Sequence, residues 1–224
     1  MKIQSFKILH CNAGWRDFSF LKIITDEGIS GISEYNECYG SPGLSIIIDR
    51  FMNKIIGENP INHERIHQYL YASSRQAPGG IAQQAIAAIE NALLDLKGKK
   101  LNVPVHTLLG GAIRNKLELY WSHCGTYRIS KELSDIMEKP QVKSLEDLKQ
   151  LGKDVKDAGY KGLKTNIFTF NGSPKLEMQG FAGKPGWPEL NVDKHIIDSL
   201  KKQIDAFRSG AGEDMGIHLD LNFN

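Results

Sequence analysis

The pattern of residues 116–224 limits the possible folds more than any other feature of the sequence. Segments with strand-like alternation take turns with segments of helical periodicity. We expect strands at 116–123, 160–168 and 216–221, and helices at 144–158 and 192–207. Parallel strands need a long crossover between them, usually a helix, so this order predicts a parallel sheet or barrel.

Residues 1–115 have a different pattern and are expected to form a separate domain. Three short strands at 3–9, 18–25 and 29–34 predict an antiparallel sheet, with a turn at Asp26-Glu27-Gly28. Helices are expected at 44–56, 61–71, 81–97 and 104–109. The whole chain has 224 residues, whereas a complete eight-stranded α/β barrel alone takes roughly 250.

Composition and charge exclude several classes of function. Lys plus Arg number 28 and Asp plus Glu 26, so the net charge of +2 predicts no nucleic-acid partner and no anionic membrane surface. No apolar run approaches the roughly 18 residues of a membrane span. Cys11, Cys38 and Cys124 are isolated from one another, which argues against a disulfide framework. We therefore expect a cytoplasmic protein.

One short motif offers a competing interpretation. His63-Glu64-Arg65-Ile66-His67 has the H-E-x-x-H spacing, which places two imidazoles one helical turn apart, as in zinc hydrolases. No third histidine stands at Ser73, where the longer motif would need it, and Arg65 brings a cation beside the expected metal. A zinc hydrolase through His63 and His67 is kept as a less favoured alternative.

A stretch of 26 residues resembles a known family. From Ala85 to Gly110 it reads AIAAIENALLDLKGKKLNVPVHTLLG. This stretch resembles the signature of the mandelate racemase/muconate lactonizing enzyme group of the enolase superfamily. The turn at 25–28, followed by Gly31 and Glu34, is also similar to that family.

The resemblance implies both a fold and a domain order. Residues 1–115 would form an α+β capping domain, an antiparallel sheet plus a helical bundle. Residues 116–224 would begin an α/β domain, a (β/α) barrel of the TIM type, with only its first three strands present in this chain. The chain is then expected to be the N-terminal part of a longer protein.

The resemblance also implies a metal-dependent reaction. Family members use Mg²⁺ to abstract the α-proton of a carboxylate substrate through an enediolate. Three carboxylates from successive barrel strands hold the metal, and Asp220 matches the first of them. Strand alternation places Asn222 on the same face as Asp220. Asn222 also matches an Asn that the family often has two residues after this ligand, so the resemblance implies that Asn222 binds substrate. The expected partner is a small-molecule carboxylate, and a homo-oligomer is expected.

A departure from the family pattern bears on the type of reaction. Lys164 matches the first lysine of the family's Lys-x-Lys pair, and Asn166 stands where the second, the usual base, would be. An amide cannot take a proton near neutral pH but can donate hydrogen bonds. Lys164 and Asn166 are thus the expected catalytic pair of a sugar-acid dehydratase. A racemase, epimerase or cycloisomerase of the same superfamily, or a non-catalytic fragment, remain alternatives.

Loops are expected to supply substrate contacts. In the family the capping domain closes over the barrel mouth, so Trp15 and Arg16 in the loop 11–17 and Tyr39 in the loop 35–40 are candidate substrate-binding residues. The connection 171–190 is much longer than the usual 2–6 residues between a strand and a helix. We interpret it as a lid.

Overall fold

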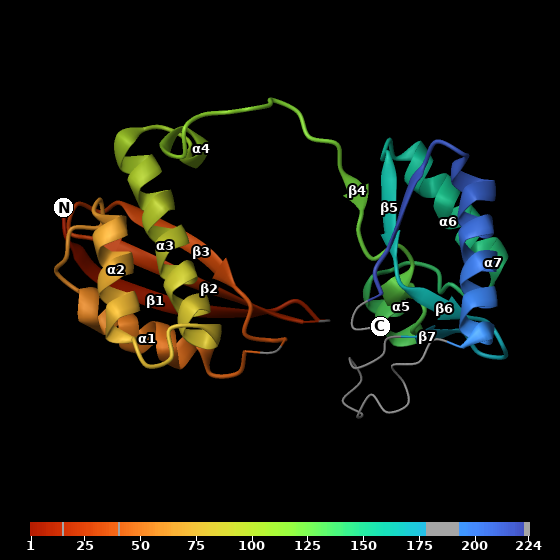
Figure 1. The fold of residues 1–224 in the computed structure, drawn as a ribbon, viewed down its shortest axis with the longest axis horizontal. Helices are drawn as coiled ribbons and strands as arrows, with labels where there is room; N and C mark the ends of the chain where they lie inside the picture. The colour runs from red at the N-terminus through yellow and green to blue at the C-terminus, as the bar shows by residue number, and fades with distance from the viewer. Residues whose placement is uncertain (15, 40, 178–192, 222–224) are drawn as a thin grey trace. The chain divides into compact units, whose positions relative to one another are not determined.

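The computed structural model describes residues 1–14, 16–39, 41–177 and 193–221. It divides the chain into an N-terminal unit, residues 1–115, and a C-terminal unit, residues 116–224. Figure 1 labels the elements of each unit. Within the described ranges, no helix combines the length and the apolarity that crossing a bilayer requires.

An antiparallel sheet forms one layer of the N-terminal unit. Its strands are β1 (Ile3–Asn12), β2 (Asp17–Thr25) and β3 (Ser30–Tyr35), in the order β1-β2-β3. Alternate residues of β2 are buried, including Leu21 and Ile23, as expected for a strand with one face on a core.

Helices cover that buried face of the sheet (Figure 1). They are α1 (Leu44–Ile55), α2 (His63–Ser73), α3 (Gly80–Leu101) and the short α4 (Val105–Leu108). The small residues of α3, Ala85, Ala88 and Ala92, are buried, which lets the helix approach β3 closely. The antiparallel sheet and helical bundle expected from the sequence are therefore confirmed.

The C-terminal unit contains a three-stranded parallel sheet. Its strands are β4 (Tyr120–Trp121), β5 (Gly162–Thr165) and β8 (Gly216–Leu219), in the order β4-β5-β8. The crossover helices α6 (Leu145–Asp157) and α7 (Lys194–Ala211) pack against each other. Side chains of Ser144 and Asp193 accept hydrogen bonds at the start of α6 and α7, as helix caps do.

The strand expected at 160–168 is wrong in one respect. It is two strands, β5 and β6 (Ile167–Thr169), separated by Asn166. β6 leaves the parallel sheet and pairs antiparallel with β7 (Lys175–Glu177). The physical reason is that the side chain of Gln203 hydrogen-bonds to two main-chain groups, the carbonyl of Asn166 and the N–H of Phe168. In a continuous strand these groups would instead pair with neighbouring strands.

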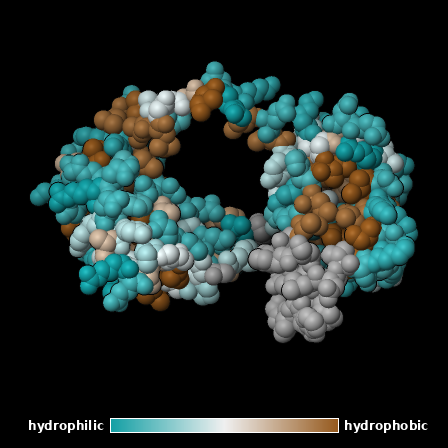
Figure 2. Space-filling model, in the orientation of Figure 1, coloured by the Kyte–Doolittle hydropathy of each residue, from teal (hydrophilic) through white to brown (hydrophobic). Residues whose placement is uncertain are grey.

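Other differences concern the connections. The strand expected at 116–123 is reduced to β4, and a 3₁₀ turn, η1 (Thr126–Arg128), and the helix α5 (Lys131–Ile136) follow it. The connection at 171–190, interpreted as a lid, contains β7, and its residues 178–190 lie outside the described residues. Apolar side chains reach the surface of both units (Figure 2), including Leu109, Ile113 and Leu117 between α4 and β4.

Burial predicts which cysteines react. Cys11 and Cys38 are exposed, whereas Cys124 is buried, and burial raises the pKa of the Cys124 thiol to about 12. Because the thiolate is the nucleophile, we expect a thiol reagent at pH 8 to modify two cysteines in the folded chain and the third only in denaturant. Counting labelled thiols with and without urea checks this. Rapid labelling of Cys124 in the folded chain would contradict the structure.

Candidate functional site

Lys164 and Asp220 meet at the carboxyl ends of adjacent parallel strands. Lys164 lies in β5 and pairs in register with His218 of β8, and Asp220 follows the last residue of β8. Lys164 Nζ lies 3.0 Å from Asp220 Oδ2, and the two side chains are 23% and 32% exposed. This is the end of a parallel sheet where barrel enzymes carry their chemistry.

Asn166 lies beside this ion pair but is buried. It is 2% exposed, accepts a hydrogen bond from the hydroxyl of Thr126 (2.8 Å) and donates one to the main-chain carbonyl of Asp220 (3.1 Å). Sequence reasoning missed Thr126 and Gln203, which complete this network. Gln203 could have been recognised in the sequence, because it is a polar residue on the apolar face of α7, four positions before Phe207.

His123 is a further titratable group at this end of the sheet. Its main chain has a φ of +51°, and its ring stacks on Tyr127 with centroids 5.1 Å apart. Burial lowers the pKa of His123, Lys164 lowers it further, and Asp220 opposes both. The lowered pKa favours the neutral imidazole, which has one donor and one acceptor nitrogen.

The carboxylate of Asp220 fits a hard metal ion such as Mg²⁺, which prefers oxygen ligands. Among the described residues, however, the only set of three His, Cys, Asp or Glu ligand atoms within 4.8 Å of one another is His63, Glu64 and Glu90. Asp220 is not a member of that set.

The substrate-binding candidates of the N-terminal unit have partners within that unit. Arg16 forms an ion pair with Glu34 (3.2 Å) and lies over the ring of Phe18, 4.0 Å from its centroid. Tyr39 is half exposed in the turn before α1. The candidates Trp15 and Asn222 lie outside the described residues.

Glu37 orders the turn that contains Tyr39. Its carboxylate accepts hydrogen bonds from the N–H groups of Gly43 (2.9 Å) and Ser45 (3.2 Å) at the start of α1. Burial raises the pKa of Glu37, but hydrogen bonds from Ser45 and Gly43 outweigh it and leave the pKa below its usual value. Tyr39 is therefore displayed on a turn that stays tied to α1 at neutral pH.

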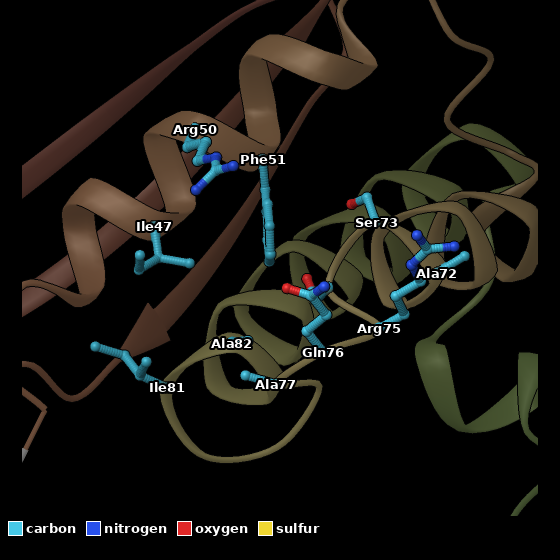
Figure 3. Close-up of a pocket in the computed structure, with 11 residues that line it drawn as sticks. Ile47, Arg50, Phe51, Ala72, Ser73, Arg75, Gln76, Ala77, Ile81 and Ala82 are labelled. Atoms are coloured by element: carbon cyan, nitrogen blue, oxygen red, sulfur yellow. The ribbon is translucent and has the colours of Figure 1, made fainter.

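A groove of about 690 Å³ lies between α1 and the connection from α2 to α3. Figure 3 shows Arg50 and Arg75 on opposite sides of it. Both arginines are exposed, and none of the candidate catalytic or metal-binding residues lines the groove.

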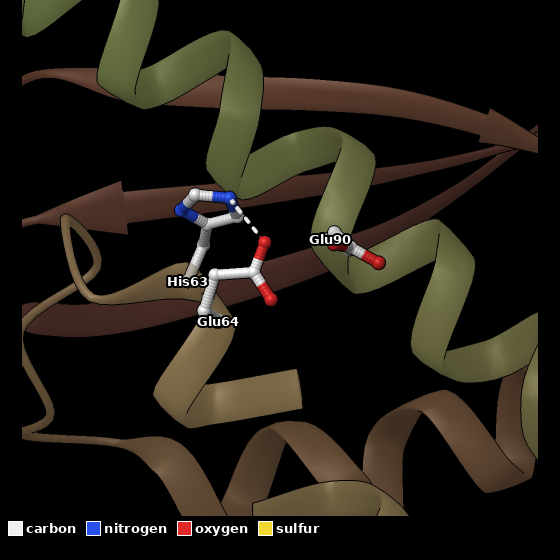
Figure 4. Close-up of side chains that lie close together, drawn as sticks. All are labelled: His63, Glu64 and Glu90. Carbon is white, nitrogen blue, oxygen red and sulfur yellow. Dashed lines mark ion pairs between the residues drawn. The ribbon is translucent and has the colours of Figure 1, made fainter. Parts of the chain in front are cut away.

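The H-E-x-x-H motif forms a polar seam between α2 and α3. His63 Nε2 lies 3.5 Å from Glu64 Oε1, and His63 Nδ1 lies 3.3 Å from Lys97 Nζ. His67 Nδ1 lies 3.0 Å from Glu90 Oε2. Figure 4 shows Glu90 on α3, across from His63 and Glu64 on α2. The cation of Lys97 beside His63 opposes a divalent metal, and Glu64 is 77% exposed.

This seam leads to a prediction about the motif. Replacing His63 or His67 with Ala removes helix-to-helix hydrogen bonds, so we expect a loss of about 1 kcal/mol in stability and almost no loss of catalytic activity. Thermal denaturation and turnover of the complete gene product, with the exposed His106→Ala as the matched control, check this. A large loss of activity together with loss of bound zinc would establish the hydrolase alternative.

Comparison with known proteins then identifies the N-terminal unit. Residues 4–110 match the mandelate racemase / muconate lactonizing enzyme, N-terminal domain. The N-terminal part of this chain belongs to that family of the enolase superfamily. The resemblance seen in residues 85–110 is therefore confirmed.

Two relatives that are named as enzymes extend the comparison. The chain is 41% identical over 101 residues to a D-galactonate dehydratase of Variovorax paradoxus, covering 45% of this chain and 26% of that protein. It is 37% identical over 142 residues to a D-galactonate dehydratase of Pectobacterium atrosepticum, covering 63% and 36%. The match therefore spans about a quarter to a third of the length of these curated relatives.

A solved structure matches both units. A protein of Burkholderia xenovorans strain LB400, described as a candidate L-alanine-DL-glutamate epimerase, is 41% identical with a TM-score of 0.91. The match covers 99% of this chain and 56% of that one. A second structure with the same description, bound to magnesium and fumarate, has a TM-score of 0.90 and covers 98% and 54%.

Proposed function

We propose that the gene product containing this chain is an enolase-superfamily enzyme. It abstracts the α-proton of a small carboxylate substrate with the help of Mg²⁺. The observation that carries the proposal is the pairing of Lys164 with Asp220 at the ends of adjacent parallel strands. The family of residues 4–110 and the magnesium and fumarate in the Burkholderia xenovorans structure support it.

In this proposal the C-terminal unit is the start of a TIM-type barrel. The parallel order β4-β5-β8 and the crossover helices α6 and α7 support it. The domain boundary at residue 115 then separates capping and catalytic domains.

Each site residue has a distinct task. Asp220 is a metal ligand, and a bound Mg²⁺ supplies the positive charge that stabilises the negative charge left when the α-proton departs. Lys164, whose Nζ pairs with the Asp220 carboxylate, binds the substrate carboxylate or the developing negative charge. Arg16, Tyr39, Trp15 and Asn222 are proposed to bind the rest of the substrate.

A sugar-acid dehydratase is the favoured reaction type. The relatives named D-galactonate dehydratase support it, and the amide of Asn166 cannot serve as a second base. In a dehydratase, the α-proton goes to one base and the β-hydroxyl leaves as water after it gains a proton from an acid. An epimerase is the second candidate, because the Burkholderia xenovorans structure is described as one.

The test measures substrate turnover by the complete gene product, first stripped of metal and then with Mg²⁺ restored. Sugar acids that include D-galactonate are incubated in D₂O and followed by NMR. We expect Mg²⁺-dependent loss of water, with no inversion at the α-carbon of recovered substrate. Efficient racemisation or epimerisation would rule out the dehydratase reaction but would remain consistent with membership of the superfamily.

A further inference from the structure

We propose that Asn166 is a positioning residue, which fixes the main chain of Asp220 and thereby aims the Asp220 carboxylate. The inference rests on the proposed function of Asp220 as a metal ligand. It assigns Asn166 a role different from the catalytic role expected from the sequence.

The first observation is where Asp220 lies relative to the sheet. β8 ends at Leu219, so the parallel ladder with β5 does not include Asp220. Its N–H still donates to the carbonyl of Thr165, at 2.9 Å. Its carbonyl would need another donor, because strand pairing no longer supplies one, and the side chain of Asn166 provides it at 3.1 Å.

The second observation is that the amide of Asn166 is held at its other end. Its Oδ1 accepts from the hydroxyl of Thr126, which is itself 5% exposed. Thr126 is the first residue of η1, five positions after β4 ends, whereas Asn166 directly follows β5 and Asp220 directly follows β8. One buried amide therefore links η1 to the carboxyl ends of β5 and β8.

The third observation is that helix α7 fixes the main chain of Asn166. Gln203 is fully buried, and its amide donates to the carbonyl of Asn166 (2.7 Å) and to the hydroxyl of Thr165 (3.1 Å). Its own oxygen accepts from the N–H of Phe168, at 2.9 Å. A satisfied buried network of this kind defines a single local arrangement.

The chemistry of the network explains why residue 166 is an amide. The position must accept from a hydroxyl and donate to a carbonyl at the same time, which an amide does in one planar group. A lysine at this position would carry donors only. At 2% exposure with both ends engaged, Asn166 is built into the framework instead of reaching a substrate.

The first experiment measures amide hydrogen exchange in the 224-residue chain. Asn166→Ala removes the donor to Asp220, so we expect exchange at Asp220 and Leu221 to accelerate by about fivefold or more, while α6 is unchanged. Thr126→Val leaves that donor in place and should give a smaller effect. Asn171→Ala, at an exposed asparagine that contacts His195, is the matched control and should have no effect.

The second experiment measures Mg²⁺ affinity of the complete gene product by calorimetry. We expect Asn166→Ala to weaken binding about tenfold or more, the range for residues that orient a ligand. Uniform acceleration of exchange throughout the unit, or unchanged exchange at 220–221, would overturn the positioning role. Lost turnover with normal exchange and normal Mg²⁺ affinity would also overturn it, since Asn166 would then contact substrate. Local acceleration in a protein that shows no Mg²⁺-dependent activity would keep the positioning of Asp220 and reject only the proposed function.

Discussion

Asp220→Asn is expected to lower Mg²⁺-dependent turnover of the complete gene product by about a thousandfold or more. An amide oxygen carries no charge, so the metal loses one anionic ligand, and several kcal/mol of charge stabilisation go with it. The fold should persist, because the ion pair with Lys164 is partly exposed and contributes at most about 1 kcal/mol. Steady-state kinetics over a range of Mg²⁺ concentrations, together with a thermal melt, measure both effects.

The matched control is Asp214→Asn, an exposed carboxylate just before β8. It changes the net charge by the same amount but lies at the opposite end of the strand from Asp220. We expect wild-type turnover from this variant. Wild-type turnover from Asp220→Asn itself would remove Asp220 from the metal site.

The sequence predicted the layers of the fold because each depends on local periodicity. Alternation in β2 and helical spacing in α3 follow directly from which side of each element is buried. The stretch 85–110 was informative because its acidic side chains hold the N-terminal unit together. Asp95 accepts a hydrogen bond from the N–H of Ile32 in β3, and Glu90 contacts His67 in α2.

The break in the strand at Asn166 could not be predicted in the same way. Residues 160–168 have the alternation of one strand, and the bend between β5 and β6 depends on Gln203, which lies 37 residues further along the chain. A polar side chain on the apolar face of a helix signals a buried partner, but not which one. The role of Asn166 therefore followed from a tertiary contact that no local pattern contains.

The H-E-x-x-H motif shows what residue spacing alone leaves open. The spacing of His63 and His67 is correct for a metal site, but spacing does not reveal which side chains a neighbouring helix supplies. Here α3 brings Lys97 to His63 and Glu90 to His67, so both imidazoles have protein partners.

Gly31→Ala is expected to destabilise the N-terminal unit by about 3 kcal/mol or more. A Cβ at Gly31 would lie 2.0 Å from the carbonyl oxygen of Ala92 and 2.9 Å from both Cβ and N of Leu96. Two of these three are main-chain atoms of α3, so no side-chain rotation can relieve the overlap. β3 and α3 must move apart, and the buried side of the sheet loses its contacts.

Gly79→Ala is the matched control, since the same methyl group would meet nothing within 4 Å and the residue has a negative φ of −89°. Urea denaturation, with amide exchange in α3 to isolate the N-terminal unit, should show a large loss for Gly31→Ala and almost none for Gly79→Ala. Equal stability of the two variants would mean that β3 and α3 are not packed this closely. The close approach also accounts for the glycine at position 31 of this chain, because the small face of α3 can only lie against a strand that has no side chain there.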